Sequence, residues 1–284
     1  MTLPNFVVVG VAKAGTSSLH GYLRQHPDVF MPQMKDPGFF AFNNQADPRR
    51  YKVTSREAYE ALFADVRGER AIGEVSDTYF DSKAAPANIK AAIPDARLIV
   101  SLREPASRAF SLYHMMLRNR GVNEGLSFLE ALERGEGLRL GYHDSLKAYF
   151  DHFDRSRIRV VLFDDLTRDT LATVQSLFGF LGIDPGFTPE LKVFNPGGVP
   201  KSKWLHRLMA NPRLRAWARD TLPESWVNAA KDLRSRNLDK SKMRMTEEER
   251  ARAVAYFRED VLKTQDLIGI DLSHWLRPRD AEAA

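Results

Sequence analysis

Short apolar runs alternate with amphipathic stretches over the first 163 residues of the chain. Each run is strand-length, rich in β-branched residues and bounded by turn or helix signals, which predicts buried strands. The predicted strands are Phe6–Val9, Ala71–Val75, Arg97–Leu102 and Ile158–Phe163. The intervening segments have helical spacing, and the predicted helices are Thr16–His26, Arg56–Val66, Ala85–Ala92, Pro105–Arg120 and Ser145–Phe153. Strands alternating with helices predict an α/β fold: a three-layer arrangement with a central parallel sheet flanked by helices.

The rest of the chain is predicted to be mostly helical. A helical pattern covers Thr170–Leu181 and ends at Gly182. Three further helical stretches are predicted around Lys203–Trp217, Trp226–Arg234 and Thr246–Ile268. We therefore expect a single domain over residues 1–284, with an α/β core at 1–169. Residues 170–284 are expected to form a helical part that packs on the sheet as a lid.

Composition narrows the class of protein. Of the 284 residues, 43% are hydrophobic and 28% charged, which is typical of a globular domain, and the longest apolar runs are too short for a transmembrane helix. The absence of cysteine excludes disulfides and thiolate chemistry, and the seven histidines have no metal-ligand spacing, so no metal is expected. Because the first predicted strand begins at Phe6, we expect no signal peptide and a cytoplasmic protein.

A candidate anion site follows the first predicted strand. Gly10 opens a turn, Lys13 and Gly15 follow, and the hydroxyl run Thr16–Ser18 begins a helix. Free backbone N–H groups and the helix dipole favour an anion at such a helix start, and Lys13 adds a full positive charge. In a nucleoside-triphosphatase P-loop the lysine directly follows the second glycine, whereas here Thr16 occupies that position.

A second candidate anion site follows the third predicted strand. That strand ends near Arg103, and Pro105 is suited to the first position of the next helix. Arg108 and Ser111 follow one and two turns into this helix. A guanidinium can bind a phosphate through two parallel hydrogen bonds, and a serine hydroxyl can add another. Both candidate sites lie at the carboxyl ends of predicted parallel strands, where ligands of such sheets bind.

The two sites resemble the nucleotide-binding motifs of sulfotransferases that use 3′-phosphoadenosine 5′-phosphosulfate (PAPS), particularly a bacterial branch related to heparan-type carbohydrate enzymes. The sequence KAGTSSL at 13–19 matches the 5′-phosphosulfate loop K-x-G-T-[ST]-[ST]-L, and 103–113 matches the 3′-phosphate motif R-x-P-x-x-R-x-x-S-x-Y. A glycine and basic segment at 197–202 resembles the loop that closes over the nucleotide. The resemblance implies a P-loop-like fold in which the core at 1–169 binds the nucleotide and residues 170–284 form a lid over nucleotide and acceptor. By this resemblance, Arg108 is structural, and the residues that bind PAPS as cosubstrate are Lys13, Ala14, Gly15, Thr16, Ser17, Ser18, Arg103, Ser111, Gly198, Lys201 and Ser202.

The same resemblance suggests catalytic groups. The segment K-D-P-G-F-F at 35–40 resembles K-E-x-x-F-F, in which the glutamate is the general base, so Asp36 is the candidate base with one methylene less. Relatives have E-K-[ST]-P-x-Y where this chain has E-V-S-D-T-Y, and Val75 replaces the lysine. Glu74 and Asp77 are alternative bases, and a structural role for Glu74 is equally open. Lys13 is expected to stabilise the leaving phosphate.

The expected reaction is in-line transfer of a sulfuryl group from PAPS to an acceptor hydroxyl of a carbohydrate, lipid or small metabolite. A P-loop nucleotide kinase or other phosphotransferase, and a non-catalytic nucleotide-binding module, are the alternatives. Between Lys201 and Arg244 the chain has twelve Lys or Arg and four Asp or Glu. This basic region is either a set of solvated helix faces or a surface for an anionic nucleotide, acceptor or membrane. We expect no nucleic-acid partner.

Overall fold

Five parallel strands form the centre of the computed structural model, in the order β2-β3-β1-β4-β5. The strands are β1 (Phe6–Gly10), β2 (Val29–Phe30), β3 (Ala71–Val75), β4 (Arg97–Leu102) and β5 (Ile158–Leu162). The structure describes residues 2–41, 51–120, 125–135, 137–192, 199–200, 238–239 and 244–277. Two predicted helices, Lys203–Trp217 and Trp226–Arg234, and nearly all of the basic region lie outside the described residues.

The strand order places both candidate anion sites next to each other. β1 is central, with Val7 opposite Glu74 of β3 on one side and Leu98 of β4 on the other. The chain therefore builds one half of the sheet, crosses over β1 and continues with β4 and β5. Ligands of open α/β sheets bind where the strand order reverses in this way, beyond the carboxyl ends of the strands.

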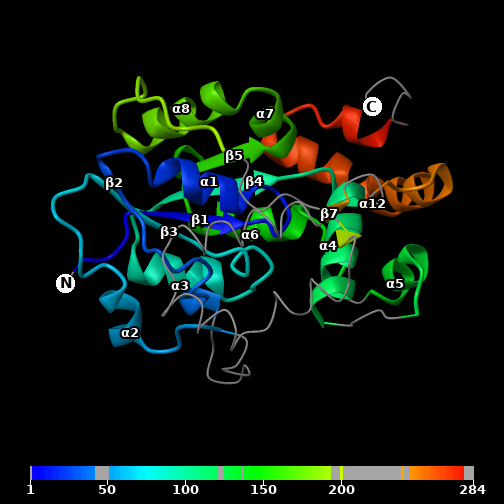
Figure 1. The fold of residues 1–284 in the computed structure, drawn as a ribbon, viewed down its shortest axis with the longest axis horizontal. Coiled ribbons are helices and arrows are strands. Elements are labelled where there is room, and N and C mark those ends of the chain that lie inside the picture. The colour runs from blue at the N-terminus through cyan, green and yellow to red at the C-terminus, as the bar shows by residue number, and fades with distance from the viewer. Residues whose placement is uncertain are drawn as a thin grey trace.

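Helices cover both faces of the sheet, as Figure 1 shows. Successive residues of a strand point to opposite faces, so Phe6 and Val8 pack into one core and Val7 and Val9 into the other. The first core contains side chains of α1 (Thr16–Leu23) and α8 (Thr170–Leu181). The second contains side chains of α2 (Arg56–Ala61), α3 (Ala85–Ala92), α4 (Pro105–Arg120), α6 (His143–His152) and α12 (Glu247–Ile268). The predicted three-layer α/β fold is confirmed.

The C-terminal part is helical where it is described, as predicted. α12 begins with a capping box in which the Thr246 side chain and Glu249 satisfy each other's backbone N–H groups. α12 packs against α4, α5 (Phe128–Arg134) and α6, and its buried residues include Ala253, Phe257 and Val261, so this helix extends the helical layer on one side of the sheet. Within the described part of the chain, none of the helices has the length and apolar character needed to cross a membrane.

Several predicted boundaries were wrong. α1 ends at Leu23 and α2 at Ala61, both earlier than predicted. β5 ends at Leu162, because Phe163 begins the helix α7 (Phe163–Arg168). Among the described elements, those that the sequence analysis did not predict are α7, β2, α5 (Phe128–Arg134), the 3-10 helices η1 (Phe39–Ala41), η3 (Arg155–Arg157) and η4 (Ser273–Leu276), and the antiparallel pair β6 (Val199–Pro200) and β7 (Leu238–Asp239).

Candidate active site

The loop between β1 and α1 folds against the end of β4. The Val11 N–H donates to the Ser101 carbonyl at 2.9 Å, and the Ala14 N–H donates to the Val11 carbonyl at 3.1 Å. Gly10 has a φ of 141°, and a Cβ there would lie 2.8 Å from the Cβ of Phe80, so glycine is required. The loop therefore delivers the first turn of α1, with Thr16, Ser17 and Ser18, to the carboxyl edge of the sheet.

Lys13 lies in this loop in a left-handed conformation, with a φ of 73°. Its pKa is lowered to about 8, first because burial removes water from the ammonium group and then because Arg118 and Arg103 carry like charges nearby. Asp77 and Lys35 also act on this lysine, with opposite effects. Three cations thus converge on a half-buried site, and an anion bound there would relieve their repulsion. Such a group of like charges favours the binding of an anion.

Arg103 connects the two predicted anion sites. It follows β4, and its Nη1 donates to the backbone carbonyl of Lys13 at 3.2 Å. Its guanidinium lies over the Phe163 ring, 4.8 Å from the centroid, which supports the charged group on an apolar face. Its own backbone carbonyl accepts a hydrogen bond of 2.6 Å from the Tyr142 hydroxyl, just before α6. The β1–α1 loop, Phe163 of α7 and Tyr142 therefore all help to orient this arginine.

Residues of α4 form one wall of the site. Ser111 is buried, and Arg118 lies seven residues further on the same side of the helix. The sequence analysis missed Arg118, although its spacing from Ser111 was a usable signal. Arg108 is 1% exposed, and its Nη2 donates to the carbonyls of Leu138 and Leu140 at 3.3 and 3.2 Å. These contacts agree with the structural role expected for Arg108.

The candidate base lies in an acidic and basic cluster beside Lys13. The Lys35 Nζ is 3.0 Å from both Asp36 carboxylate oxygens and 4.0 Å from an Asp77 oxygen. The Asp36 backbone N–H donates to the Val75 carbonyl at 2.8 Å, which ties this segment to the end of β3. Burial and the nearby Asp36 charge raise the pKa of Asp77. The Asp36 side chain remains 29% exposed and is therefore accessible to an acceptor.

Glu74 is placed differently from Asp36. It is 1% exposed, and its carboxylate accepts hydrogen bonds from the hydroxyls of Tyr59, Tyr79 and Ser76. A base must reach the proton that it abstracts, and a carboxylate enclosed by three protein donors offers no position for an acceptor hydroxyl. Of the two interpretations left open by the sequence, this geometry supports the structural one.

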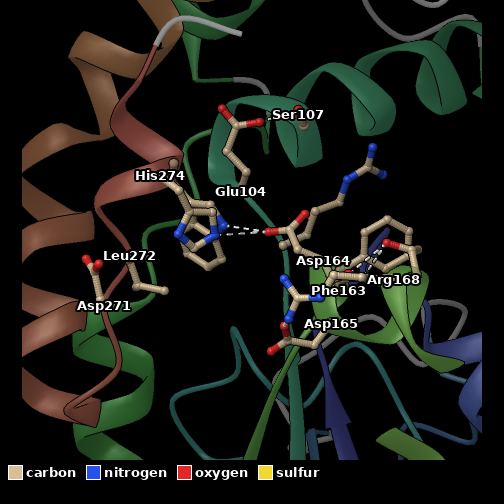
Figure 2. Close-up of polar contacts among 12 residues, drawn as sticks. Glu104, Ser107, Phe163, Asp164, Asp165, Arg168, Asp271, Leu272 and His274 are labelled. Atoms are coloured by element: carbon tan, nitrogen blue, oxygen red, sulfur yellow. Dashed lines mark hydrogen bonds and ion pairs between the residues drawn. The ribbon is translucent and has the colours of Figure 1, made fainter. Parts of the chain in front are cut away.

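A buried ion pair connects α12, in the helical C-terminal part, to the residue that follows Arg103. Glu104 follows Arg103 directly, and its carboxylate is 2.9 Å from the Arg250 guanidinium on α12. The hydroxyl of Ser107 also donates to Glu104. Figure 2 shows this Glu104–Ser107 contact beside the first turn of α7 and the end of the chain. α12 is thereby anchored directly behind the candidate 3′-phosphate site.

The end of the described chain reaches the same region. In η4 the Trp275 Nε1 donates to the Asp164 carboxylate at 2.7 Å. The His274 Nε2 is 3.5 Å from the same oxygen (Figure 2). Asp164 is the residue after Phe163, on whose ring Arg103 rests. Gly198, Lys201 and Ser202 lie outside the described residues, so their predicted contacts with the nucleotide stay a prediction.

Known sulfotransferases are similar to this chain in sequence and in fold. A family model described as the sulfotransferase domain matches residues 3–265. A sulfotransferase crystal structure from Alicyclobacillus acidocaldarius is 30% identical, with a TM-score of 0.73, and covers 98% of this chain and 100% of its own. Mouse heparan sulfate glucosamine 3-O-sulfotransferase 3B1 is 29% identical over 202 residues, which are 68% of this chain and 50% of the mouse protein.

A human bifunctional heparan sulfate N-deacetylase/N-sulfotransferase 2 is 27% identical over 207 residues, 64% of this chain and 22% of the human protein. The chain thus spans half or less of the length of these two heparan sulfate enzymes. The family match covers most of the chain, including both predicted nucleotide motifs and the segment that carries Asp36. This protein belongs to the family of PAPS-dependent sulfotransferases.

Proposed function

We propose that this protein transfers the sulfuryl group of PAPS to a hydroxyl of a saccharide acceptor. The observation that carries the proposal is that the like charges of Arg103 and Arg118 act on the half-buried Lys13, while Lys35 and Asp77, which act on it too, adjoin the Asp36 carboxylate. The names of the heparan sulfate relatives favour a saccharide among the acceptor classes considered.

In this reaction the acceptor oxygen forms a bond to sulfur while the bond from sulfur to the 5′-phosphate oxygen breaks. The products are a sulfate ester and 3′-phosphoadenosine 5′-phosphate (PAP). In this proposal Lys13 stabilises the charge that grows on the leaving phosphate, and Asp36 accepts the proton of the acceptor hydroxyl. Arg103 and Ser111 would hold the 3′-phosphate, which takes no part in the bond changes.

The test is transfer of label from [³⁵S]PAPS to N-sulfated heparosan oligosaccharides, with excess EDTA present. We expect labelled oligosaccharide and PAP in equal amounts, and strongly reduced label with the Asp36→Asn variant. A parallel reaction with [γ-³²P]ATP and Mg²⁺ examines the phosphotransferase alternative. Phosphoryl transfer in that reaction, together with no sulfuryl transfer to saccharide, lipid or small-molecule hydroxyls, would overturn the proposal.

A further inference from the structure

The buried carboxylate of Glu74 lies next to the Lys35–Phe40 segment, which carries Asp36. The Glu74 Oε1 accepts hydrogen bonds from the hydroxyls of Tyr79 at 2.6 Å and Tyr59 at 3.0 Å, and its Oε2 accepts one from Ser76 at 3.0 Å. A buried carboxylate is costly unless its oxygens are satisfied in this way. Because each neighbour is a hydroxyl, the ionised carboxylate can act only as acceptor and each hydroxyl must direct its hydrogen toward it.

Two of these three hydroxyls continue to the backbone of the Lys35–Phe40 segment. The Gly38 N–H donates to the Ser76 Oγ at 3.1 Å, and the Phe40 N–H donates to the Tyr79 Oη at 3.4 Å. With their hydrogens directed at Glu74, the oxygens of Ser76 and Tyr79 present their lone pairs to these N–H groups. Glu74 is therefore connected to the segment through two hydroxyl relays.

Tyr59 differs from the other two donors. No relay to a backbone N–H of the described segment is recorded for its hydroxyl, and its ring stacks on Phe39 with centroids 4.5 Å apart. Like Ser76 and Tyr79, Tyr59 donates a hydrogen bond to Glu74, but it supports the Lys35–Phe40 segment only through ring packing. This difference provides a matched control within the same buried cluster.

The supported segment has an unfavourable backbone. Asp36 has a φ of 58°, which is uncommon for a residue other than glycine, and Gly38 has a φ of 77°. A Cβ at Gly38 would lie 2.8 Å from the Tyr51 ring. Backbone of this kind persists only where the surroundings hold it in place. The two relays supply such contacts within four residues of Asp36.

We propose that Glu74 is a positioning residue that holds the Lys35–Phe40 segment, and with it the Asp36 carboxylate, through Ser76 and Tyr79. The catalytic part of this inference rests on the proposed function, in which Asp36 is the base. The structural part, that Glu74 protects the two backbone N–H groups, stands on the hydrogen bonds alone.

The electrostatic surroundings agree with this role. Burial raises the pKa of Glu74 to about 7, opposed by the three hydroxyl donors and increased slightly by the Asp36 charge. The other ionisable groups around this cluster are Tyr59 on α2, Tyr79, and Tyr149 on α6, whose hydroxyl donates to the Tyr79 carbonyl. The charge of Asp81 acts on Tyr149. The positioning of Asp36 by the ionised Glu74 carboxylate would thus weaken as the pH falls below about 7.

The experiment compares Glu74→Gln, Ser76→Ala and Tyr59→Phe with the wild type. Hydrogen exchange of the Gly38 and Phe40 amides reports on the segment without any enzyme assay. Glu74→Gln should speed exchange at both amides by about tenfold, and Ser76→Ala should act mainly at Gly38. Tyr59→Phe should change either amide by less than about threefold. Unchanged exchange in a folded Glu74→Gln protein would overturn the inference.

The second readout is sulfuryl transfer to N-sulfated heparosan together with PAP titration. Glu74→Gln and Ser76→Ala should lower kcat by about 10- to 100-fold, since misplacement of a catalytic group by about 1 Å has such an effect. PAP affinity should stay within about twofold, and the fall in wild-type kcat below pH 7 should be absent in Glu74→Gln.

If the wild type transfers no sulfuryl group, the proposed function fails while the exchange result still decides the structural part. If it does and Glu74→Gln keeps the wild-type kcat, the catalytic part is wrong.

Discussion

The backbone N–H of Asp77 donates a hydrogen bond to the Asp36 carboxylate at 3.2 Å. The two residues follow different strands, yet both acidic side chains face Lys35. The Asp36 carboxylate accepts hydrogen bonds from this N–H and from the Lys35 ammonium group. Burial and the charge of Asp36, in contrast, raise the pKa of Asp77. The pair is therefore unequal: Asp36 is held as an acceptor at the edge of the site, and Asp77 orients it through its backbone.

Replacing Asp36 by asparagine should slow transfer by about 10²–10⁴-fold, the usual contribution of a general base. Asparagine has the same shape and tolerates the left-handed backbone at this position, so the fold and PAP affinity should be kept. Single-turnover rates and PAP titrations measure the two effects separately. Asp77→Asn is the matched control, because it keeps the backbone N–H and should cost much less. A wild-type rate for Asp36→Asn would direct the search for the base to Asp77.

Glutamate at position 36 should give a different result. Asp36→Glu restores the carboxylate of the related carbohydrate enzymes and should retain measurable activity. Because Asp36 has a φ of 58°, the longer side chain should also destabilise the fold by about 1–2 kcal/mol, the cost of a left-handed residue without local hydrogen bonding. Urea unfolding of the two variants would detect this cost, and equal stability of Asp36→Glu and Asp36→Asn would contradict it.

Arg103→Ala should weaken nucleotide binding more than it slows transfer. Arg103 is expected to bind a phosphate that does not react, so its loss should cost about 1.5–3 kcal/mol of PAP affinity. Lys147→Ala removes one positive charge from an exposed side chain of α6 and serves as the control. Calorimetric titration with PAP and with ATP provides the measurement. Normal PAP affinity in Arg103→Ala, or equal affinity of the wild type for ATP and PAP, would contradict the prediction that Arg103 binds the 3′-phosphate.

The sheet and the anion loop could be predicted because their signals are local. Four apolar runs gave four of the five strands of the sheet, and the Lys13 loop and the Arg103 helix follow them directly. β2 has only two residues and pairs at the edge of the sheet, so it left too short a pattern. α5 was missed although Ser127 and Glu130 form a capping box, which the sequence does display.

Other features depend on contacts between distant residues and left no local pattern. α6 begins at His143, two residues earlier than predicted, because the Asp260 carboxylate on α12 accepts the N–H groups of Tyr142 and His143. Such a cap from another helix replaces the local Ser, Thr, Asn or Asp that usually marks a helix start. Likewise, the motif alone left a catalytic and a structural role open for Glu74. The surrounding hydroxyls, one of them from Tyr59 on α2, distinguish the two roles.

The buried pair between Glu104 and Arg250 should matter for stability. Their side chains are only 8% and 14% exposed, so removing one partner leaves an uncompensated charge. Glu104→Ala should therefore destabilise the protein by about 3–5 kcal/mol. The double variant Glu104→Met with Arg250→Met should recover most of this loss, and Lys147→Ala in an exposed pair should cost little. Urea unfolding measures all of these, and a Glu104→Ala protein as stable as Lys147→Ala would show that the pair does not anchor α12.

Nucleotide binding should take up a proton through Lys13 at alkaline pH. In the nucleotide-free protein the pKa of Lys13 is about 8, against an ordinary value of 10.5. Between these values the unfolded chain holds a proton that the folded chain has lost, so this group makes the free protein more stable as the pH rises. A bound phosphate favours the charged amine and moves its pKa upward, so the lysine must be protonated on binding.

Titrations of PAP at pH 8.5–9 in buffers of different ionisation enthalpy measure this uptake (the pH is about half to one unit above the pKa of Lys13). We expect net uptake of a fraction of a proton with the wild type and much less with Lys13→Ala. For the same reason kcat/KM, which reports the free enzyme, should fall as the pH rises through about 8. Lys13→Ala should have a far lower kcat and lack this alkaline limb. Proton uptake that persists in Lys13→Ala would assign the proton to another group. It would contradict the prediction that Lys13 contacts the reacting phosphate.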